Sequence, residues 1–265
     1  MKRFDKYGLC LEEYTNNYNN AKVYYNRAVG KSPEMEVSKA MAKIIKKYIK
    51  KDERVLDVGC ATGHFYRSLK REIKESFYYT GCDPYKIFLD FAIKAWKNDK
   101  KASFKKGNIY NLPFKKNSFD ICFSSNVLLH LPDISKPIKE LLRVTKKKLI
   151  LRTVVYDVSY KIQLVYNNKW WKNTKVKPID EFDKKGNPRS FSYFNIHSKD
   201  YLQALINKTS PKSKVKFIKD NFFLKSKINK SIKTEKRPLA TRIIGDEQFS
   251  GCLMQPHYFV IIEKS

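Results

Sequence analysis

The fold is decided by a stretch that reads Arg54-Val55-Leu56-Asp57-Val58-Gly59-Cys60-Ala61-Thr62-Gly63-His64-Phe65. A short apolar and β-branched run ends at Asp57, two glycines follow four positions apart, and a helical pattern of apolar residues begins at Phe65. This order predicts a strand, a tight turn and a helix, which form the first unit of a doubly wound α/β sheet. Glycine is needed where the backbone turns sharply or where a ligand contacts the main chain.

The turn differs from the fingerprint of dinucleotide-binding proteins. That fingerprint has three glycines in the pattern G-x-G-x-x-G, whereas Ala61 lies between Gly59 and Gly63 here. Asp57 also precedes the first glycine, and a buried anion there would repel a pyrophosphate but would suit a ligand with an ammonium group. Taken alone, the turn is also compatible with an ordinary strand, turn and helix without a ligand.

Three more predicted strands end in polar residues. The second strand ends at Asp83-Pro84, 26 positions after Asp57, and a carboxylate there can accept hydrogen bonds from both hydroxyls of a ribose. The third, over about 102–105, leads into Gly107-Asn108-Ile109, and the fourth ends at Ser124-Ser125. Because ligands of open α/β sheets bind at the carboxyl ends of the strands, we expect these residues to surround one ligand.

Residues from about 50 to 155 resemble class I S-adenosylmethionine-dependent methyltransferases of the small-molecule and quinone-biosynthesis type. The resemblance implies an α/β fold with a Rossmann-like, seven-stranded, doubly wound sheet and S-adenosyl-L-methionine as cofactor. It implies that Asp57 approaches the methionine end of the cofactor, that Asp83 binds the ribose and that Ile109 packs on the adenine. Asn108 replaces an acid of the family, and its amide oxygen can still accept from the adenine amine. The other predicted cofactor-binding residues are Gly59, Cys60, Ala61, Gly63, Pro84, Ser124, Ser125 and Arg27.

The predicted organisation is an N-terminal helical cap over residues 1–50 and a methyltransferase domain over 51–265, with insertions at about 156–195 and 225–256. Ser32 is predicted to be the N-cap and Pro33 the first residue of a helix that reaches about Tyr48. The resemblance implies that such a cap acts as a lid, in which Arg27 pairs with the cofactor carboxylate. A surface arginine is the alternative.

The two insertions differ in composition. The first, after the fifth strand, is rich in aromatic residues, which would form a pocket for the methyl acceptor, a small core of their own, or both. These residues are Tyr160, Tyr166, Trp170, Trp171, Phe182, Phe191, Tyr193 and Phe194. The second insertion is basic, and its Arg237, Arg242 and Gln248 are candidates for binding an anionic acceptor. A surface loop is the alternative for its lysine-rich part.

The composition of the chain further restricts its possible partners and cellular location. The net charge of +29 is compatible with a nucleic-acid partner, but the lysines are dispersed, which favours a solvated surface. The five cysteines form no C-x-x-C pair, which predicts reduced thiols in the cytoplasm rather than disulfides or a zinc site. No apolar run is long enough to span a membrane, and Phe4-Asp5-Lys6-Tyr7 interrupts any signal-peptide core.

His130, just past the fourth strand, is the candidate general base. A role in shaping the pocket is the alternative, His197 and His257 are weaker candidates, and His64 begins a helix near the cofactor. The stretch from Ser124 to Val127 lacks the Asn-Pro-Pro-Tyr motif of nucleobase amino-methyltransferases. We therefore predict an enzyme that methylates O or N of a small molecule such as a sugar, a lipid-like compound or a secondary metabolite. The alternatives are an RNA or protein methyltransferase and a non-catalytic cofactor-binding protein.

Overall fold

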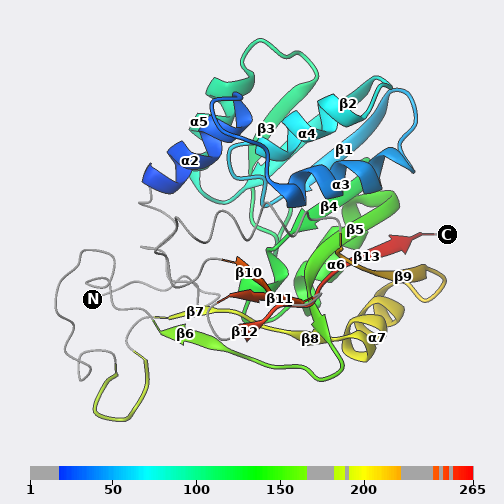
Figure 1. Ribbon diagram of the computed structural model, residues 1–265. Helices are drawn as coiled ribbons and strands as arrows, with labels where there is room; N and C mark the ends of the chain where they lie inside the picture. The colour runs from blue at the N-terminus through cyan, green and yellow to red at the C-terminus, as the bar shows by residue number, and fades with distance from the viewer. Residues whose placement is uncertain are drawn as a thin grey trace.

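The structure is a computed structural model that describes residues 18–165, 182–188, 191–221, 241–244, 247–250 and 253–264. Along its central sheet the strands are ordered β3-β2-β1-β4-β5-β13-β9 (Figure 1). Their bounds are β1 Glu53–Val58, β2 Phe77–Asp83, β3 Ala102–Lys106, β4 Phe119–Ser125, β5 Thr145–Tyr156, β9 Lys214–Lys219 and β13 His257–Glu263. Strands β1 to β5 are parallel, whereas β13 is antiparallel to both β5 and β9. The predicted Rossmann-like sheet is confirmed, with a short strand β8, His197–Ser198, added beside β5.

Helices cover both faces of the sheet (Figure 1). On one face lie α3 (Glu36–Lys46), α4 (His64–Glu72) and α5 (Lys86–Trp96), and on the other lie α6 (Ser135–Val144) and α7 (Lys199–Thr209). Because side chains alternate along each strand, two apolar clusters form, one on each face. The cluster beneath α3 and α4 includes Met41, Ile44, Leu69, Ile121 and Phe123, and the cluster beneath α6 and α7 includes Leu141, Leu202, Cys122, Leu149 and Leu151.

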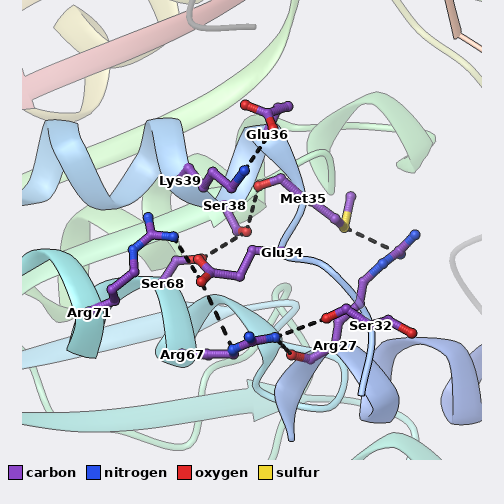
Figure 2. Close-up of polar contacts among 10 residues, drawn as sticks. All are labelled: Arg27, Ser32, Glu34, Met35, Glu36, Ser38, Lys39, Arg67, Ser68 and Arg71. Atoms are coloured by element: carbon purple, nitrogen blue, oxygen red, sulfur yellow. Dashed lines mark hydrogen bonds and ion pairs between the residues drawn. The ribbon is translucent and has the colours of Figure 1, made fainter. Parts of the chain in front are cut away.

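In the described part of the N-terminal cap, the first helix is α2 (Tyr18–Ala28), which packs on α4 and α5. The predicted start of the next helix was wrong, because α3 starts at Glu36 with Met35 as its N-cap. The physical reason is that the connecting segment is tied to α4 by polar contacts (Figure 2). Arg67 donates to the carbonyl oxygens of Arg27 and Ser32, both at 2.9 Å.

Glu34 is the centre of these polar contacts (Figure 2). Its carboxylate accepts from Ser68 Oγ and, at 2.8 Å, from Arg71 Nη1, and its side chain is only 8% exposed. Ser68 Oγ also lies 3.0 Å from Ser38 Oγ. The cap is therefore fastened to the helix that follows the glycine turn.

Two predicted strand boundaries were wrong. The sequence pattern predicts a fifth strand over Lys148–Val155. Instead, α6 passes directly into β5 at Thr145, whose Oγ1 donates to the Leu141 carbonyl at 2.7 Å. The sequence pattern predicts a sixth strand over Val215–Phe223, whereas β9 ends at Lys219. It ends there because Asp220 turns inward and forms a buried ion pair with Arg152.

The described parts of the insertions contain short strands. In the first, β6 (Gln163–Val165) pairs with β7 (Phe191–Tyr193), while Tyr166, Trp170 and Trp171 lie outside the described residues. In the second, β10 (Thr241–Ile244), β11 (Glu247–Ser250) and β12 (Leu253–Met254) form a three-stranded sheet. None of the helices within the described ranges is long and apolar enough to cross a bilayer.

Candidate functional site

The glycine turn after β1 has an unusual backbone. Gly59 and Gly63 have positive φ angles of 83° and 69°, and Ala61 also adopts the left-handed region, with φ at 47°. The backbone N–H groups of Gly59 and Cys60 donate to the Cys82 carbonyl at 2.8 and 3.2 Å, so the turn is fixed to the end of β2. The left-handed conformation at Gly59 is the reason for glycine there, because other residues adopt it only with strain.

Asp83 joins the first turn to the second. Its Oδ2 accepts from the Ala61 N–H and its Oδ1 from the Tyr85 N–H, both at 3.0 Å. Burial raises the pKa of Asp83 to about 6, although both N–H donors oppose the shift. Each carboxylate oxygen has a further lone pair, so Asp83 retains the capacity to accept hydrogen bonds from a ligand.

Asp57 lies in the interior, with 2% of its surface exposed. Its Oδ2 accepts from the hydroxyl of Tyr79 at 2.7 Å, and the Tyr79 ring stacks on Tyr66 at 4.5 Å between centroids. Burial raises the pKa of Asp57 to about 8, with the Tyr79 hydrogen bond opposing the shift and the charge of Asp83 adding to it. The carboxyl group is therefore engaged with the core cluster under α4.

The turns after β3 and β4 adjoin the first two. The Gly107 N–H donates to the Asp83 carbonyl at 3.1 Å, and Ser124 Oγ donates to the Val58 carbonyl at 2.8 Å. Asn108 uses its Oδ1 locally, where it accepts from the Tyr110 N–H at 2.9 Å, and Ile109 is buried in the core cluster. The structure thus brings the four predicted turns together at the carboxyl ends of the strands.

Two buried hydroxyls at these turns have no hydrogen-bond partner among the described residues. They are Thr62 Oγ1, in the glycine turn, and Ser125 Oγ, at the end of β4. Unpaired buried polar atoms are rare and call for an explanation, such as a bound molecule that supplies the missing partner. We call the turns at the carboxyl ends of β1 to β4 the rim of the sheet. The polar groups at this rim therefore fit a polar ligand with hydroxyl and amine groups. The other two predicted residues at the rim are Cys60, whose thiol is buried, and Pro84, which is half-buried.

Arg27 lies near His64, the residue after the glycine turn, and its contacts are with the protein. Its guanidinium is 5.6 Å from the ring centroid of Tyr24, and its Nη1 is 3.5 Å from Met35 Sδ. Tyr24 in turn stacks on His64, with 4.9 Å between centroids. Burial, with the nearby charge of Arg27, lowers the pKa of His64 to about 3, so this ring is neutral.

His130 ends the 3₁₀ turn η1 (Leu128–His130) and faces the first insertion. Its Nδ1 lies 2.9 Å from the Tyr193 carbonyl, and its ring is 6.3 Å from that of Phe194. Because a carbonyl only accepts, Nδ1 carries the proton and Nε2 carries the lone pair of the neutral ring. Burial lowers the pKa of His130, which favours this neutral form.

The other two histidines have different surroundings. Burial lowers the pKa of both His197 and His257, and the charge of Arg152 adds to the effect on His257. His257 Nδ1 lies 3.1 Å from the Gln255 carbonyl. They lie on β8 and β13, away from the glycine turn in the order of the sheet.

Sequence reasoning missed a buried polar cluster near the end of β4. Arg152 donates from Nε to Asp220 Oδ2 at 2.7 Å and from Nη1 to Asn126 Oδ1 at 2.6 Å. An arginine within the apolar run Leu149–Val155 was the available signal. Gln248, predicted to bind an anionic acceptor, is instead buried and donates to the Asp220 carbonyl at 3.4 Å. Arg237 and the side chain of Arg242 lie outside the described residues.

Comparisons with known proteins agree with this geometry. A family model described as a methyltransferase domain matches residues 56–151. An uncharacterized methyltransferase of Schizosaccharomyces pombe is 38% identical over 108 residues, which are 38% of this chain and 38% of that protein. The demethylmenaquinone methyltransferase of Lactiplantibacillus plantarum is 30% identical over 136 residues, which are 50% of this chain and 56% of that enzyme. The chain thus matches about half, or less, of the length of these relatives.

A solved structure gives the same fold. The S-adenosylmethionine-dependent methyltransferase of Methanosarcina mazei superposes with a TM-score of 0.53 over 83% of this chain and 96% of that one, at 18% identity. The sheet and its glycine turn define the class I methyltransferase fold. Residues 56–151 therefore match a methyltransferase domain in sequence, and the chain shares its fold with an S-adenosylmethionine-dependent methyltransferase.

Proposed function

We propose that the chain binds S-adenosylmethionine at the carboxyl ends of β1 to β4 and transfers its methyl group to O or N of a small molecule. The observation that carries the proposal is the bridge between Asp83 and Ala61, which joins the glycine turn to the acid at the end of β2. A carboxylate fixed in this way is oriented before a ribose arrives, which lowers the entropy cost of binding.

Each predicted residue has a proposed task at this rim. Asp83 would accept hydrogen bonds from the ribose hydroxyls, and Asn108 and Ile109 would contact the adenine. Asp57 and Arg27 would face the ammonium and carboxylate of the methionine part, respectively. Main-chain groups of Gly59, Cys60, Ala61 and Gly63 would line the ligand, together with Pro84, Ser124 and Ser125. The Ser125 hydroxyl, which has no partner among the described residues, supports this assignment.

The sulfonium of the cofactor supplies an already activated methyl group. What remains for the protein is to hold the acceptor atom in line with that group and to exclude water. For a hydroxyl acceptor, His130 Nε2 is the proposed proton acceptor, because Nδ1 is committed to the Tyr193 carbonyl. An amine acceptor in its neutral form would need no base.

The proposed acceptor is a small molecule with an apolar or aromatic part. The contact between His130 and Phe194, next to β7, supports such an acceptor. The similarity to a demethylmenaquinone methyltransferase also supports a small acceptor related to a quinone. A ubiquinone/menaquinone biosynthesis C-methyltransferase of Campylobacter jejuni, 30% identical over 118 residues, makes methylation at carbon a further candidate. The free thiols of Cys60, Cys82 and Cys122 support action in a reducing compartment such as the cytoplasm.

The net charge of +29 favours a second candidate, an RNA or protein methyltransferase that binds its acceptor through the basic surface. Isothermal titration with S-adenosylmethionine and S-adenosylhomocysteine tests the cofactor first. Transfer of tritiated methyl groups to a panel of a catechol, a naphthol, a quinol, primary amines and total tRNA then separates the acceptors. We expect binding and transfer to a member of the small-molecule set.

Each other outcome has a definite meaning. Transfer to tRNA alone, with an affinity that falls steeply with salt, would favour the second candidate. Binding without transfer to any acceptor would indicate a cofactor-binding protein without this activity. Absence of binding to either adenosyl compound would contradict the proposed function.

A further inference from the structure

We propose that Arg152 is a positioning residue of the methyl-donor site, and that Asp220 holds Arg152 in place. The proposal rests on the proposed function, because it concerns the turn after β4 that adjoins the cofactor rim. Arg152 does not contact the glycine turn itself. It acts through Asn126 and Val127, which follow Ser125.

The ion pair is buried on both sides. The side chains of Arg152 and Asp220 are only 5% and 4% exposed, and Nε lies 2.7 Å from Oδ2. Arg152 lies between Ser125 on β4 and Phe259 on β13 in the register of the sheet. Because desolvation of two charges offsets most of their attraction, a buried pair adds little net stability compared with apolar residues. Stability alone is therefore a weak explanation for an arginine in this strand.

Arg152 holds Asn126 at two points. Its Nη1 donates to Asn126 Oδ1 at 2.6 Å, and its carbonyl accepts from the Asn126 N–H at 2.9 Å. Asn126 has a positive φ of 58°, a conformation that non-glycine residues adopt at a cost. The two hydrogen bonds offset that cost and fix the direction in which the chain leaves β4. Because a guanidinium only donates, the orientation of the Asn126 amide is also determined.

The next residue transmits this geometry to the glycine turn. A Cβ atom added to Gly59 would lie 2.4 Å from Val127 Cγ2, so Val127 packs directly on the backbone of Gly59. A change in the Asn126 turn would move Val127 and release this packing. Asp220 thus contacts Arg152, and Arg152 contacts Asn126. The neighbour of Asn126, Val127, contacts Gly59.

The test compares two neutralised ion pairs in the full chain. In the double variant Arg152→Gln/Asp220→Asn both charges of the pair are removed, so neither Arg152 nor Asp220 is left as a buried charge without the other. The control is Glu53→Gln/Lys147→Gln at the opposite edge of the sheet, where Lys147 Nζ donates to the buried carboxylate of Glu53 at the start of β1 and also lies 3.1 Å from Asp120 Oδ1. The measurements are affinity for S-adenosylhomocysteine by isothermal titration and hydrogen exchange of peptides that cover residues 124–130.

We expect the Arg152/Asp220 variant to lose roughly tenfold or more in affinity and to exchange faster over residues 124–130, while the control changes by about threefold or less. Arg152→Lys, which can keep a bond to Asp220 but has no second nitrogen for Asn126, is expected to fall between them. Equal affinities in the two double variants, with unchanged exchange, would overturn the proposal.

Two other outcomes, a double variant that does not fold and a wild-type chain that does not bind, can also be interpreted. If the double variant does not fold, Asn126→Gly provides the same test, because it keeps the ion pair and permits the positive φ while it removes the amide. It is expected to lose a similar factor in affinity, and wild-type affinity for this variant would overturn the proposal. If the wild-type chain binds no S-adenosylhomocysteine, the proposed function fails, and not only the role of Arg152.

Discussion

Gly59 and Val127 are in contact beside β1 and β4, the two strands between which the strand order of the sheet reverses. A Cβ atom on Gly59 would lie only 2.4 Å from Val127 Cγ2, a separation that real Cβ atoms do not show. Gly59 follows β1 and Val127 follows β4, and these neighbouring strands begin the two halves of the sheet, which extend in opposite directions. Ligands of open α/β sheets bind at this switch point. The contact therefore ties the glycine at this position to the geometry of the candidate site.

The first prediction separates backbone strain from collision at Gly59. Gly59→Ala is expected to lower the free energy of unfolding by about 1–2 kcal/mol for the left-handed backbone and by a further 1–3 kcal/mol, roughly, for overpacking against Val127. The control is Gly186→Ala, where φ is 77° but nothing lies within 4 Å of the added Cβ. Urea unfolding measures both. Equal losses of stability at the two glycines would contradict the contact between Gly59 and Val127. The double variant Gly59→Ala/Val127→Ala is expected to recover the loss that is due to overpacking.

The second prediction concerns the acid at the end of β2. Asp83→Asn keeps one acceptor oxygen but loses the charge, and it is expected to weaken S-adenosylhomocysteine binding by about 1–3 kcal/mol. Asp90→Asn is the matched control, because Asp90 lies exposed on α5 and pairs with Lys86 of the same helix. Isothermal titration provides the measurement. Unchanged affinity for Asp83→Asn would remove Asp83 from the proposed site.

The third prediction is a pH dependence of stability. Burial raises the pKa of Asp57 from 3.8 to about 8, so the folded chain binds a proton that the unfolded chain releases. The stabilisation is full below about pH 4 and is lost as the pH rises through about 8. Burial also raises the pKa of Asp83, to about 6, so Asp83 contributes to the loss of stability with rising pH only up to about pH 6. From about pH 6.5 to 8.5, the wild-type chain is therefore expected to lose stability on the order of 2 kcal/mol more than Asp57→Asn.

Urea titrations of both proteins at the two ends of this pH range measure the difference. The amide side chain in Asp57→Asn cannot ionise but can still accept from Tyr79, so the interaction seen at 2.7 Å is retained in the variant. Parallel pH profiles for the two proteins would show that Asp57 is already ionised at neutral pH.

The fourth prediction concerns the proton on His130. With Nδ1 bonded to the Tyr193 carbonyl and the ring buried, His130 is expected to be the neutral Nδ1–H tautomer and to titrate below 6.5. Nitrogen-15 NMR of the ring reports both the tautomer and the pKa. The same ring in urea, where it titrates near its ordinary value of about 6.5, is the reference. An Nε2–H tautomer would exclude Nε2 as the proposed base.

The fifth prediction tests how the cap is fastened to α4. Glu34→Gln is expected to lower the free energy of unfolding by about 1–2 kcal/mol, because Ser68 and Arg71 lose a charged acceptor. Hydrogen exchange over residues 18–32 is expected to increase as α2 loosens. Glu36→Gln is the control, since the Glu36 carboxylate pairs with Lys39 on the same helix (Figure 2) and is expected to change stability by about 0.5 kcal/mol or less. Equal effects would show that the cap is held by its apolar contacts.

Much of the sheet and its rim was predictable because the signals are local. The order of strand, glycine turn and helix around Asp57 and the acid at Asp83 determined the first two strands. The sequence likewise predicts Ser198 as the N-cap of a helix that reaches about Asn207, and its Oγ accepts from the Tyr201 N–H at 3.2 Å in the structure. The roles of these side chains toward a cofactor remain predictions.

The features that were missed depend on distant contacts. Ser32 and Pro33 have the local pattern of a helix start, but Arg67, more than thirty residues away, binds the Ser32 carbonyl. The ion pair of Arg152 and Asp220 joins residues 68 positions apart, and it forms only because β13 places β9 near β5. Periodicity along the chain carries no information about such pairs.

The position of β13 has a consequence for how the domain is made. This strand follows β5 and β9 in the chain, yet it lies between them and is hydrogen-bonded to both. During synthesis β5 therefore emerges with an apolar edge for which the partner does not yet exist, and β9 has no neighbour to join. Such long-range pairing slows folding and leaves an exposed edge open to wrong partners. The edge of β5 is therefore covered by β13 only after residues 257–263 have left the ribosome.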